Sequence, residues 1–490
     1  MVRICDAALK SQGSFELDWS YAGINAGERR TAYRPSRRCN VKDYGAVMDG
    51  TSDDRDAVQA AVEACGRAGG GSVEIPAGTL RLEGQVKIRY SNVILRGAGR
   101  EQTTIYIPHS LEYYNRKPRS NKTSSAHIYS RSKGFLEIIG LRNRRERNGY
   151  LSSVTASSPA GSQELNLKDA SKIFPGQWIR LHMSDPKDGP AERSLVGHMY
   201  SNPETTAQCG SSCLSGLRGE KDVIRFMSRV QSVDGDVITL SRQLPVDVNP
   251  AWKPVVYSIL DEQVVQDSGI QDLTVEFGWK RTKPHLMEAG HNAVMLEETV
   301  FCWVKNVAVV NADVNFLVRH SNFATVTEVN ARVTKDRSLK GCGGKQGHIG
   351  IAIHDSSDVL VSNFNIEDRW GHDLSTRNSQ LSVFRQGRGM DLNMDLHRNA
   401  PYMMLYEDIH LGEGARPFTT GGKDASGMPT AGYSTFVNIR SFEGRPILLP
   451  GCKYGPNLNF FGSFRRGKGM RSCKGWSVSD TVNRGGLYGN

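Results

Sequence analysis

The sequence predicts an all-β protein in which short parallel strands stack as successive turns of a coil. From residue 268 onward, two series of short β-rich segments alternate along the chain. One series occupies residues 303–310, 325–333, 359–366, 381–388, 404–411 and 436–442. Val307 precedes Val329 by 22 residues, and Phe364 precedes Ile409 by 45, which is close to two such steps. A repeat near this length, rich in β-branched residues, is typical of one turn of a parallel β-helix.

A short helix is predicted ahead of the coil, within residues 40–82. Thr51 or Ser52 is expected to cap this helix, and the acids that follow suit the positive end of its dipole. We interpret those acids as helix-start residues and not as catalysts. The apolar stripe of the helix consists of Val58, Ala61, Val62 and Cys65.

The segments "DYGAVMDGTSDDRDAVQAAVEA", "GGGSVEIPAGTLRL" and "VILRGAG" resemble the N-terminal motif of the pectate lyase superfamily, which is related to family 28 glycosidases. The resemblance extends from residue 40 to about residue 445. It implies a right-handed parallel β-helix whose open N-terminal end is covered by the helix. It implies no single chemistry, because several enzyme classes and phage tailspikes share the motif. The family 28 catalytic set and the calcium-binding aspartates of pectate lyases are not recognisable here.

Five regions are predicted along the chain. Residues 150–257 interrupt the repeat with β-rich segments and a Gly-Asp hairpin, which indicates a small inserted β subdomain with a long loop. Within that loop, Cys209 and Cys213 are close enough for a local disulfide. The other regions are an N-terminal extension (1–39), the cap and first turns (40–149), the main turns with the site (258–462), and a basic C-terminal tail (463–490).

Composition narrows the function classes. No apolar run is long enough to span a membrane, and no nucleic-acid-binding motif accompanies the net charge of +11. A basic surface of this kind attracts an acidic polysaccharide or oligosaccharide. Nine cysteines without zinc-type spacing favour a secreted or extracellular protein with a few disulfides, although the first 20 residues lack the hydrophobic segment of a signal peptide. Long β-helices of this kind also assemble as homo-oligomers.

Ionisable residues gather at both edges of the other strand series. This series is predicted at residues 291–297, 313–320, 348–355, 371–378, 390–398, 416–423 and 445–451. Because neighbouring parallel strands lie about 4.8 Å apart, residues at one edge come within reach of one another and shift each other's pKa values. The predicted catalytic residues are His348, His372, Asp373, Asp391, Asp395, His397 and Arg398. The predicted substrate-binding residues are Arg319, His320, His354, Arg377, Tyr402 and Arg416.

β-Elimination on an acidic polysaccharide, the polysaccharide lyase reaction, is the preferred interpretation. It needs a cation on the uronate carboxylate, a base for the C5 proton and an acid for the leaving oxygen. Arg398 and Arg377 would hold the carboxylate. The base would be His372 or His348, and the acid His397 or Tyr402.

Two alternatives stay open. An inverting glycoside hydrolase needs two carboxyl groups roughly 6.5–9.5 Å apart, and Asp373 with Asp391 is the better pair on neighbouring turns. A non-catalytic glycan-binding or structural β-helix is the other alternative. None of these readings requires a cofactor, and no metal ligand is assigned, although Asp373, Asp391 and Asp395 offer the oxygen atoms that calcium prefers.

Overall fold

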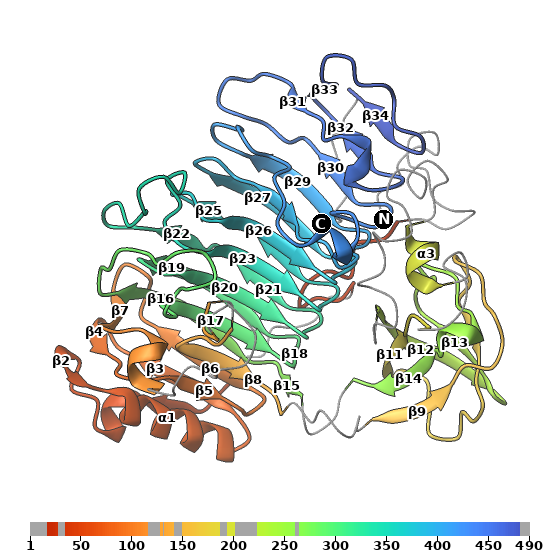
Figure 1. Ribbon diagram of the computed structural model, residues 1–490. Helices are drawn as coiled ribbons and strands as arrows, with labels where there is room; N and C mark the ends of the chain where they lie inside the picture. The colour runs from red at the N-terminus through yellow and green to blue at the C-terminus, as the bar shows by residue number, and fades with distance from the viewer. Residues whose placement is uncertain are drawn as a thin grey trace.

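A computed structural model describes residues 17–27, 35–115, 128–130, 132–141, 149–186, 194–200, 223–259 and 264–480. Strands from successive turns of the chain lie side by side and build a long coil (Figure 1). The sequence-based expectation of an all-β parallel β-helix is confirmed. No helix in the described part of the chain is long and apolar enough to cross a membrane.

The longest ladder runs along the whole coil, and every pairing in it is parallel. Its strands are β1 (Arg38–Asn40), β3 (Gly71–Ile75), β6 (Val93–Gly97), β16 (Gly269–Phe277), β19 (Trp303–Val310), β21 (Thr325–Thr327), β24 (Leu360–Ser362), β27 (Val383–Gly389), β29 (Leu405–His410), β30 (Thr435–Val437), β32 (Asn459–Phe461) and β34 (Ser477–Ser479). Shorter strands extend it sideways: β2 (Asp49–Asp53), β4 (Gly78–Arg81), β7 (Thr103–Ile107), β22 (Asn330–Arg332) and β25 (Asn365–Ile366). These strands account for the series that the 22-residue spacing predicted.

A second parallel ladder carries the ionisable residues. It consists of β5 (Val86–Ile88), β8 (Leu136–Ile139), β17 (Asn292–Glu297), β20 (Val314–Arg319), β23 (Ile349–His354), β26 (His372–Arg377) and β28 (Met394–Leu396). Ile351 is in register with Leu374, and both belong to the core inside the coil. Ala352 belongs instead to a separate buried cluster with Met295 and Leu317. The alternation of side chains along a strand explains this division between two faces.

The predicted strands after residue 400 differ from this pattern. Residues 416–423 form a loop, not a strand, and 445–451 contain only the short β31 (Ile447–Leu448), which pairs with β33 (Phe464–Arg465). Pro417 has no amide hydrogen for a ladder, and Gly421 and Gly422 weaken a strand interior. A further two-stranded sheet joins β15 (Val265–Gln266) to β18 (Thr299–Val300).

Helix α1 (Arg55–Arg67) covers the N-terminal end of the coil and contacts β1, β3, β5 and β6. Its predicted apolar stripe is buried. The predicted cap at Thr51 or Ser52 is wrong, because residues 49–53 form β2 and the N-cap residue is Asp54. The Asp54 carboxylate accepts hydrogen bonds from the amides of Val47 and Met48. A disulfide between Cys39 and Cys65 ties the helix to β1.

Residues 149–259 include an antiparallel sheet beside the coil (Figure 1). Its strands are β9 (Tyr150–Ser153), β10 (Glu164–Asn166), β11 (Trp178–Met183), β12 (Ile224–Asp234), β13 (Val237–Leu240) and β14 (Val255–Ser258), and α3 (Leu195–Met199) lies next to them. Its hydrophobic core continues into the coil through Tyr402, Met403 and Tyr433. Cys209 and Cys213 lie outside the described residues. A second disulfide joins Cys452 and Cys473, whereas Cys302 is a buried free thiol and Cys342 an exposed one.

Candidate functional site

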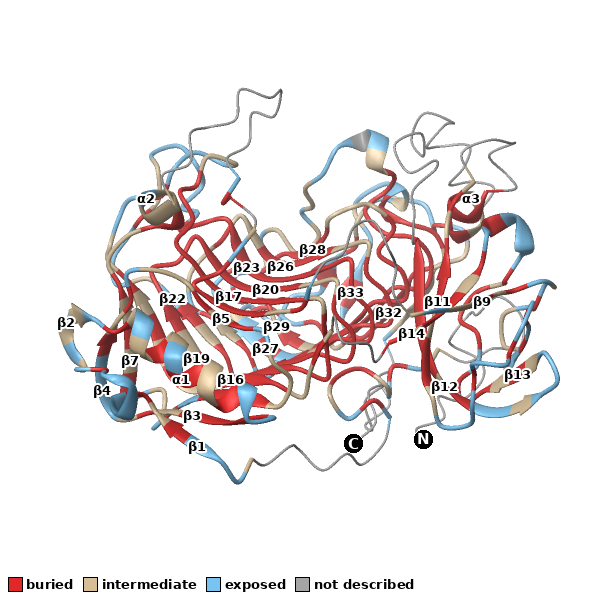
Figure 2. Ribbon diagram, turned by 90° about the horizontal axis from the view of Figure 1, so that it is seen from below, coloured by how far each residue is buried: buried red, intermediate tan, exposed pale blue. Residues whose placement is uncertain are grey.

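The candidate site is a cavity of about 510 Å³ at one edge of the second ladder. Three loops, 282–288, 339–347 and 419–421, border it together with Gly371, His372 and Asn393. Figure 2 shows β20, β23, β26 and β28 as a buried layer between α2 (Leu111–Asn115) and the antiparallel sheet. The cavity therefore opens where the strands of the second ladder meet the loops that connect them to the rest of each turn.

Four imidazoles gather at this edge. The ring centroids of His285 and His348 are 4.7 Å apart, those of His348 and His372 are 5.2 Å apart, and those of His372 and His397 are 4.7 Å apart. Strand register explains part of the cluster, since His372 pairs with Ile349, the residue after His348. His285 reaches the cluster from the loop before β17.

Asp395 joins two of these rings. Its Oδ2 atom lies 2.6 Å from Nδ1 of His372 and 2.9 Å from Nδ1 of His397, and its Oδ1 atom accepts a hydrogen bond from the amide of Gly421. Burial alone would raise the pKa of Asp395, but the hydrogen bonds from His372 and His397 outweigh burial and hold the pKa well below its usual range. An ionised Asp395 therefore holds a hydrogen on Nδ1 of each ring.

His285 and His372, the two histidines that line the cavity, are neutral at pH 7. Partial burial lowers the pKa of His285 to about 4. Burial also lowers the pKa of His372, although Asp395 opposes the shift. A neutral imidazole with a hydrogen on Nδ1 presents a lone pair on Nε2. Such a nitrogen can accept a proton or bind a metal.

Gly421 is required where the 419–421 loop crosses the imidazoles. A Cβ atom at this position would lie 2.1 Å from Cε1 of His397 and 2.7 Å from Cε1 of His372. Only glycine allows the backbone to approach both rings this closely. The loop found at 416–423 in place of the predicted strand thus packs against both rings.

Asp373 and Asp391 form a separate buried network with Arg416. Nη2 of Arg416 lies 2.6 Å from Oδ2 of Asp373, and its Nε lies 3.1 Å from Oδ2 of Asp391. Asp373 also accepts hydrogen bonds from the amides of Trp370 and Asn393. Burial raises the pKa of Asp373 to about 6, although Arg416 opposes the shift. The two carboxylates share Arg416 as their partner, and neither lines the cavity.

The predicted residues at the other edge of the ladder form an ion-pair row. Nη2 of Arg319 lies 2.6 Å from Oε1 of Glu297, and Nη2 of Arg377 lies 3.0 Å from Oδ2 of Asp355. His320 lies 3.8 Å from both Glu297 and Asp355, and His354 is buried beside them. The Cα of Arg377 is five residues along β26 from that of His372, roughly 16 Å. This row is therefore remote from His372, whereas His397 follows the Thr376–Leu396 pair and lies at the same level as Arg377.

Tyr402 and Arg398 are also placed away from the cavity wall. Tyr402 is buried, its ring centroid is 6.1 Å from that of Tyr433, and burial raises its pKa well above its usual value. Nη1 of Arg398 donates a hydrogen bond to the carbonyl oxygen of Gly427. Of the predicted catalytic residues, the structure thus brings together His348, His372, Asp395 and His397.

Comparison with known proteins agrees with this architecture. A family model described as "Rhamnogalacturonase A/epimerase, pectate lyase-like" matches residues 38–144. The tailspike protein gp49 from Pseudomonas phage LKA1 superposes with a TM-score of 0.52 at 14% identity, over 86% of this chain and 70% of that chain. The chain has the parallel β-helix fold, and its residues 38–144 match a pectate-lyase-like family model.

Two curated relatives of this β-helix protein match over a short segment. "Alginate lyase 7" from Azotobacter vinelandii is 47% identical over 74 residues, which is 14% of this chain and 9% of that protein. "Mannuronan C5-epimerase AlgE6" from the same organism is 49% identical over 75 residues, 14% of this chain and 8% of that protein. The match thus spans less than a tenth of each relative. Both relatives are carbohydrate-active enzymes.

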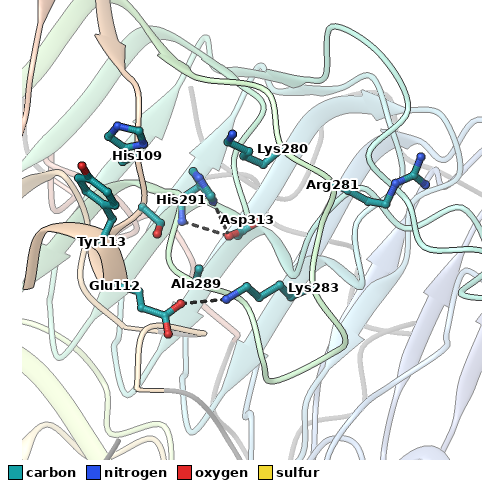
Figure 3. Close-up of a pocket in the computed structure, with 10 residues that line it drawn as sticks. His109, Glu112, Tyr113, Lys280, Arg281, Lys283, Ala289, His291 and Asp313 are labelled. Atoms are coloured by element: carbon teal, nitrogen blue, oxygen red, sulfur yellow. Dashed lines mark hydrogen bonds and ion pairs between the residues drawn. The ribbon is translucent and has the colours of Figure 1, made fainter. Parts of the chain in front are cut away.

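A second cavity of about 500 Å³ in the β-helix protein adjoins the first (Figure 3). Lys283 lines both cavities, and its Nζ lies 2.9 Å from Oε2 of Glu112. In Figure 3, His291 and its partner Asp313 lie between Lys280 and Lys283. Basic side chains therefore line both cavities, together with the acidic Glu112, Asp313 and Glu288.

Sequence reasoning missed His285, Glu288, Lys283 and Lys345, all of which line the first cavity. They lie in loops between strands, where no repeat marks them. The density of ionisable residues in "KPHLMEAGH", immediately before β17, is the signal that could have found three of them. Its position next to a strand of the second ladder places it at the same edge as His348.

Proposed function

We propose that this β-helix protein cleaves an acidic polysaccharide of the polyuronate class by β-elimination in the first cavity. The observation that carries the proposal is the His397–Asp395 pair beside a lysine-lined cavity. Asp395 holds the hydrogen on Nδ1 of His397, so Nε2 presents its lone pair. His397 is adjacent to Gly421, which lines the cavity. His397 is accordingly the proposed base for the C5 proton.

The reaction needs three groups. His397 removes the proton from C5, the bond between C4 and its oxygen breaks, and a C4–C5 double bond forms. The imidazolium that results is stabilised by the Asp395 carboxylate. Lys283 and Lys345, which line the cavity, supply ammonium groups that neutralise the uronate carboxylate and protonate the leaving oxygen. This assignment replaces the expected roles of Arg398, Arg377 and Tyr402.

Inverting hydrolysis receives less support. It requires one protonated carboxyl group and one carboxylate that can activate water. Asp373 and Asp391 are fully buried, and Arg416 bonds to both. Ala415 and Arg369 also bond to Asp391, so its two oxygens are occupied. A water molecule and a glycosidic oxygen have no route to this pair.

C5 epimerisation is the second candidate, because the matched relatives include enzymes named mannuronan C5-epimerase. It begins with removal of the same C5 proton. The proton then returns to the opposite face, and the glycosidic bond stays intact. His397 would act as the base in either reaction. The two reactions differ in whether the bond between C4 and its oxygen breaks.

The experiment is a polymer screen in which ultraviolet absorbance and new reducing ends are followed on each sample. Alginate comes first because of the names of the matched relatives, followed by polygalacturonate and glucuronan. Absorbance and reducing ends rising together is the expected result. Reducing ends without absorbance would contradict elimination and indicate hydrolysis. In D₂O, deuterium at C5 without cleavage would indicate epimerisation.

Variants assign the roles. His397→Gln is expected to lower kcat by about 10²–10⁴-fold, the usual contribution of a general base. Lys345→Met is expected to raise KM as well, because it removes a charge that binds the substrate carboxylate. His410→Gln, on β29, is the matched control and should retain activity. Unchanged turnover in His397→Gln would remove this residue from the mechanism.

A further inference from the structure

Three imidazoles converge on one point of the first cavity. One ring nitrogen from each of His285, His348 and His372 lies within 4.8 Å of the other two. The Nε2 atoms of His285 and His372 are 3.4 Å apart. The three side chains come from separate chain turns: a loop before β17, the residue before β23 and the first residue of β26. Only the fold brings them together.

The outward nitrogens of two rings are fixed by hydrogen bonds on their other side. Nδ1 of His372 donates to the ionised Asp395 over 2.6 Å. Nδ1 of His348 lies 2.7 Å from the carbonyl oxygen of Ser130, and a carbonyl can only accept. Each ring therefore carries its hydrogen on Nδ1 and its lone pair on Nε2. A metal-binding histidine is almost always oriented by a carboxylate or carbonyl partner of this kind.

We propose that His285, His348 and His372 bind a divalent first-row transition metal ion, with zinc as the best match. Two nitrogens at 2.0–2.1 Å from a tetrahedral ion lie about 3.3–3.4 Å apart, which is the spacing of the His285 and His372 Nε2 atoms. Without a metal, the same distance is that of a long hydrogen bond from an Nε2 hydrogen of His285 to Nε2 of His372, so metal binding by the wild-type chain separates the two arrangements. The ligand nitrogen of His348 lies within 4.8 Å of the other two.

The ligand chemistry argues against calcium. Calcium takes six to eight oxygen ligands, whereas imidazole nitrogen suits zinc and its neighbours. Asp373 and Asp391, two of the three aspartates whose oxygen atoms would suit calcium, are bonded to Arg416. The third aspartate, Asp395, orients His372 through a hydrogen bond and is not proposed as a ligand of the ion. A second arrangement of His372, Asp395 and His397 would require both Nδ1 hydrogen bonds to Asp395 to break.

Three histidines leave one tetrahedral position for an exogenous ligand. Three protein ligands with an open fourth position are typical of catalytic zinc, and four protein ligands are typical of structural zinc. The cavity of about 510 Å³ lies beside His285 and His372, so a water molecule or a substrate oxygen can reach the ion. If the proposed function holds, a uronate carboxylate fits this position and His397 remains available as the base. The metal site itself does not depend on that reaction.

The test uses the full chain without any polymer. The purified protein is stripped with a chelator, equilibrated with Zn²⁺ or Co²⁺, dialysed and measured for bound metal. One ion per chain is expected, and Co²⁺ should give the strong visible absorption of a four- or five-coordinate site. His285→Ala and His348→Ala should weaken binding by more than the 10–100-fold typical of outer-shell changes. His285 lies in an exposed loop, so its variant should keep the fold.

Two further variants complete the design. Cys342→Ser removes an exposed thiol that lines the same cavity and should leave binding unchanged. His410→Ala is the control for a histidine outside the cluster and should bind as the wild type does. The proposal is overturned if the wild-type chain retains no metal, if His285→Ala binds normally, or if only Cys342→Ser loses binding. Because no substrate is present, inactivity of the enzyme and absence of the metal are separate results.

Discussion

Nδ1 of His372 lies 2.6 Å from Oδ2 of Asp395, across the neighbouring strands β26 and β28. The same carboxylate oxygen lies 2.9 Å from Nδ1 of His397. One buried aspartate thus sets the orientation and the tautomer of two imidazoles. The proposed base and the proposed metal ligand depend on this single side chain.

Asp395→Asn should therefore reduce polymer turnover and metal affinity together. The amide keeps the size of the side chain but removes the charge that holds a hydrogen on Nδ1 of each ring. We expect a 10–100-fold loss in each property, with an unchanged far-ultraviolet circular dichroism spectrum. Turnover and metal content are measured on the same preparation. Wild-type values for both would show that the hydrogen bonds do not orient the rings.

Gly421→Ala should disturb the site more than the fold. A Cβ atom at position 421 would lie 2.1 Å from Cε1 of His397, so the loop or the imidazole has to move. We expect at least about a tenfold loss of turnover, since displacements of 1 Å at a reacting centre cost up to 10²-fold. Gly451→Ala is the matched control, because Gly451 has a φ of −67° and open space at the Cβ position. Equal activity of the two variants would refute the close-approach argument.

Arg416→Met should destabilise the protein strongly. The substitution leaves Asp373 and Asp391 buried without the guanidinium that bonds to both. Removing one partner of a buried ion pair typically costs about 3–5 kcal/mol, and denaturant unfolding measures this loss. Arg445→Met is the control, because Arg445 pairs with Glu443 on the surface, and exposed pairs contribute about 0–1 kcal/mol. A loss of substrate affinity with unchanged stability would support the sequence-based expectation that Arg416 binds substrate.

His354 should make the protein less stable as the pH falls. Burial, reinforced by the charge of Arg377, lowers the pKa of His354 well below 6.5. The unfolded chain therefore takes up a proton below about pH 6.5 that the folded chain does not. The free energy of unfolding should decline on acidification, with a slope approaching about 1.4 kcal/mol per pH unit for one proton.

His354→Gln tests this contribution, because glutamine does not titrate. Urea unfolding between pH 7 and pH 5 should show a shallower decline in the variant than in the wild type. His410→Gln serves again as the control, since it removes a histidine at the end of β29. If the free energy of unfolding declined equally with pH in the wild type and in His354→Gln, His354 would not be a neutral imidazole in the folded protein at these pH values.

The β-helix, its N-terminal helix and several residues of the candidate site could be predicted from the amino-acid sequence. The β-branched segments near 22 residues apart specify strands that bury one face only against neighbouring turns. The Val58–Cys65 stripe of α1 follows from helical periodicity in the same way. Since His348, His372 and Asp395 lie on strands with a common repeat, their proximity could be predicted from spacing alone.

Which of these residues lie together at the first cavity could not be predicted from the sequence and depends on contacts between chain turns. Asp373 follows His372 directly in the chain, yet it bonds to Arg416 while His372 bonds to Asp395. Successive side chains in a strand turn to different faces, and a local change of register cannot be read from the pattern. His285 and Gly421 come from loops without periodicity, so contacts across turns placed them at the site. The repeat fixes which strands are neighbours, whereas side-chain direction and loop packing fix the chemistry.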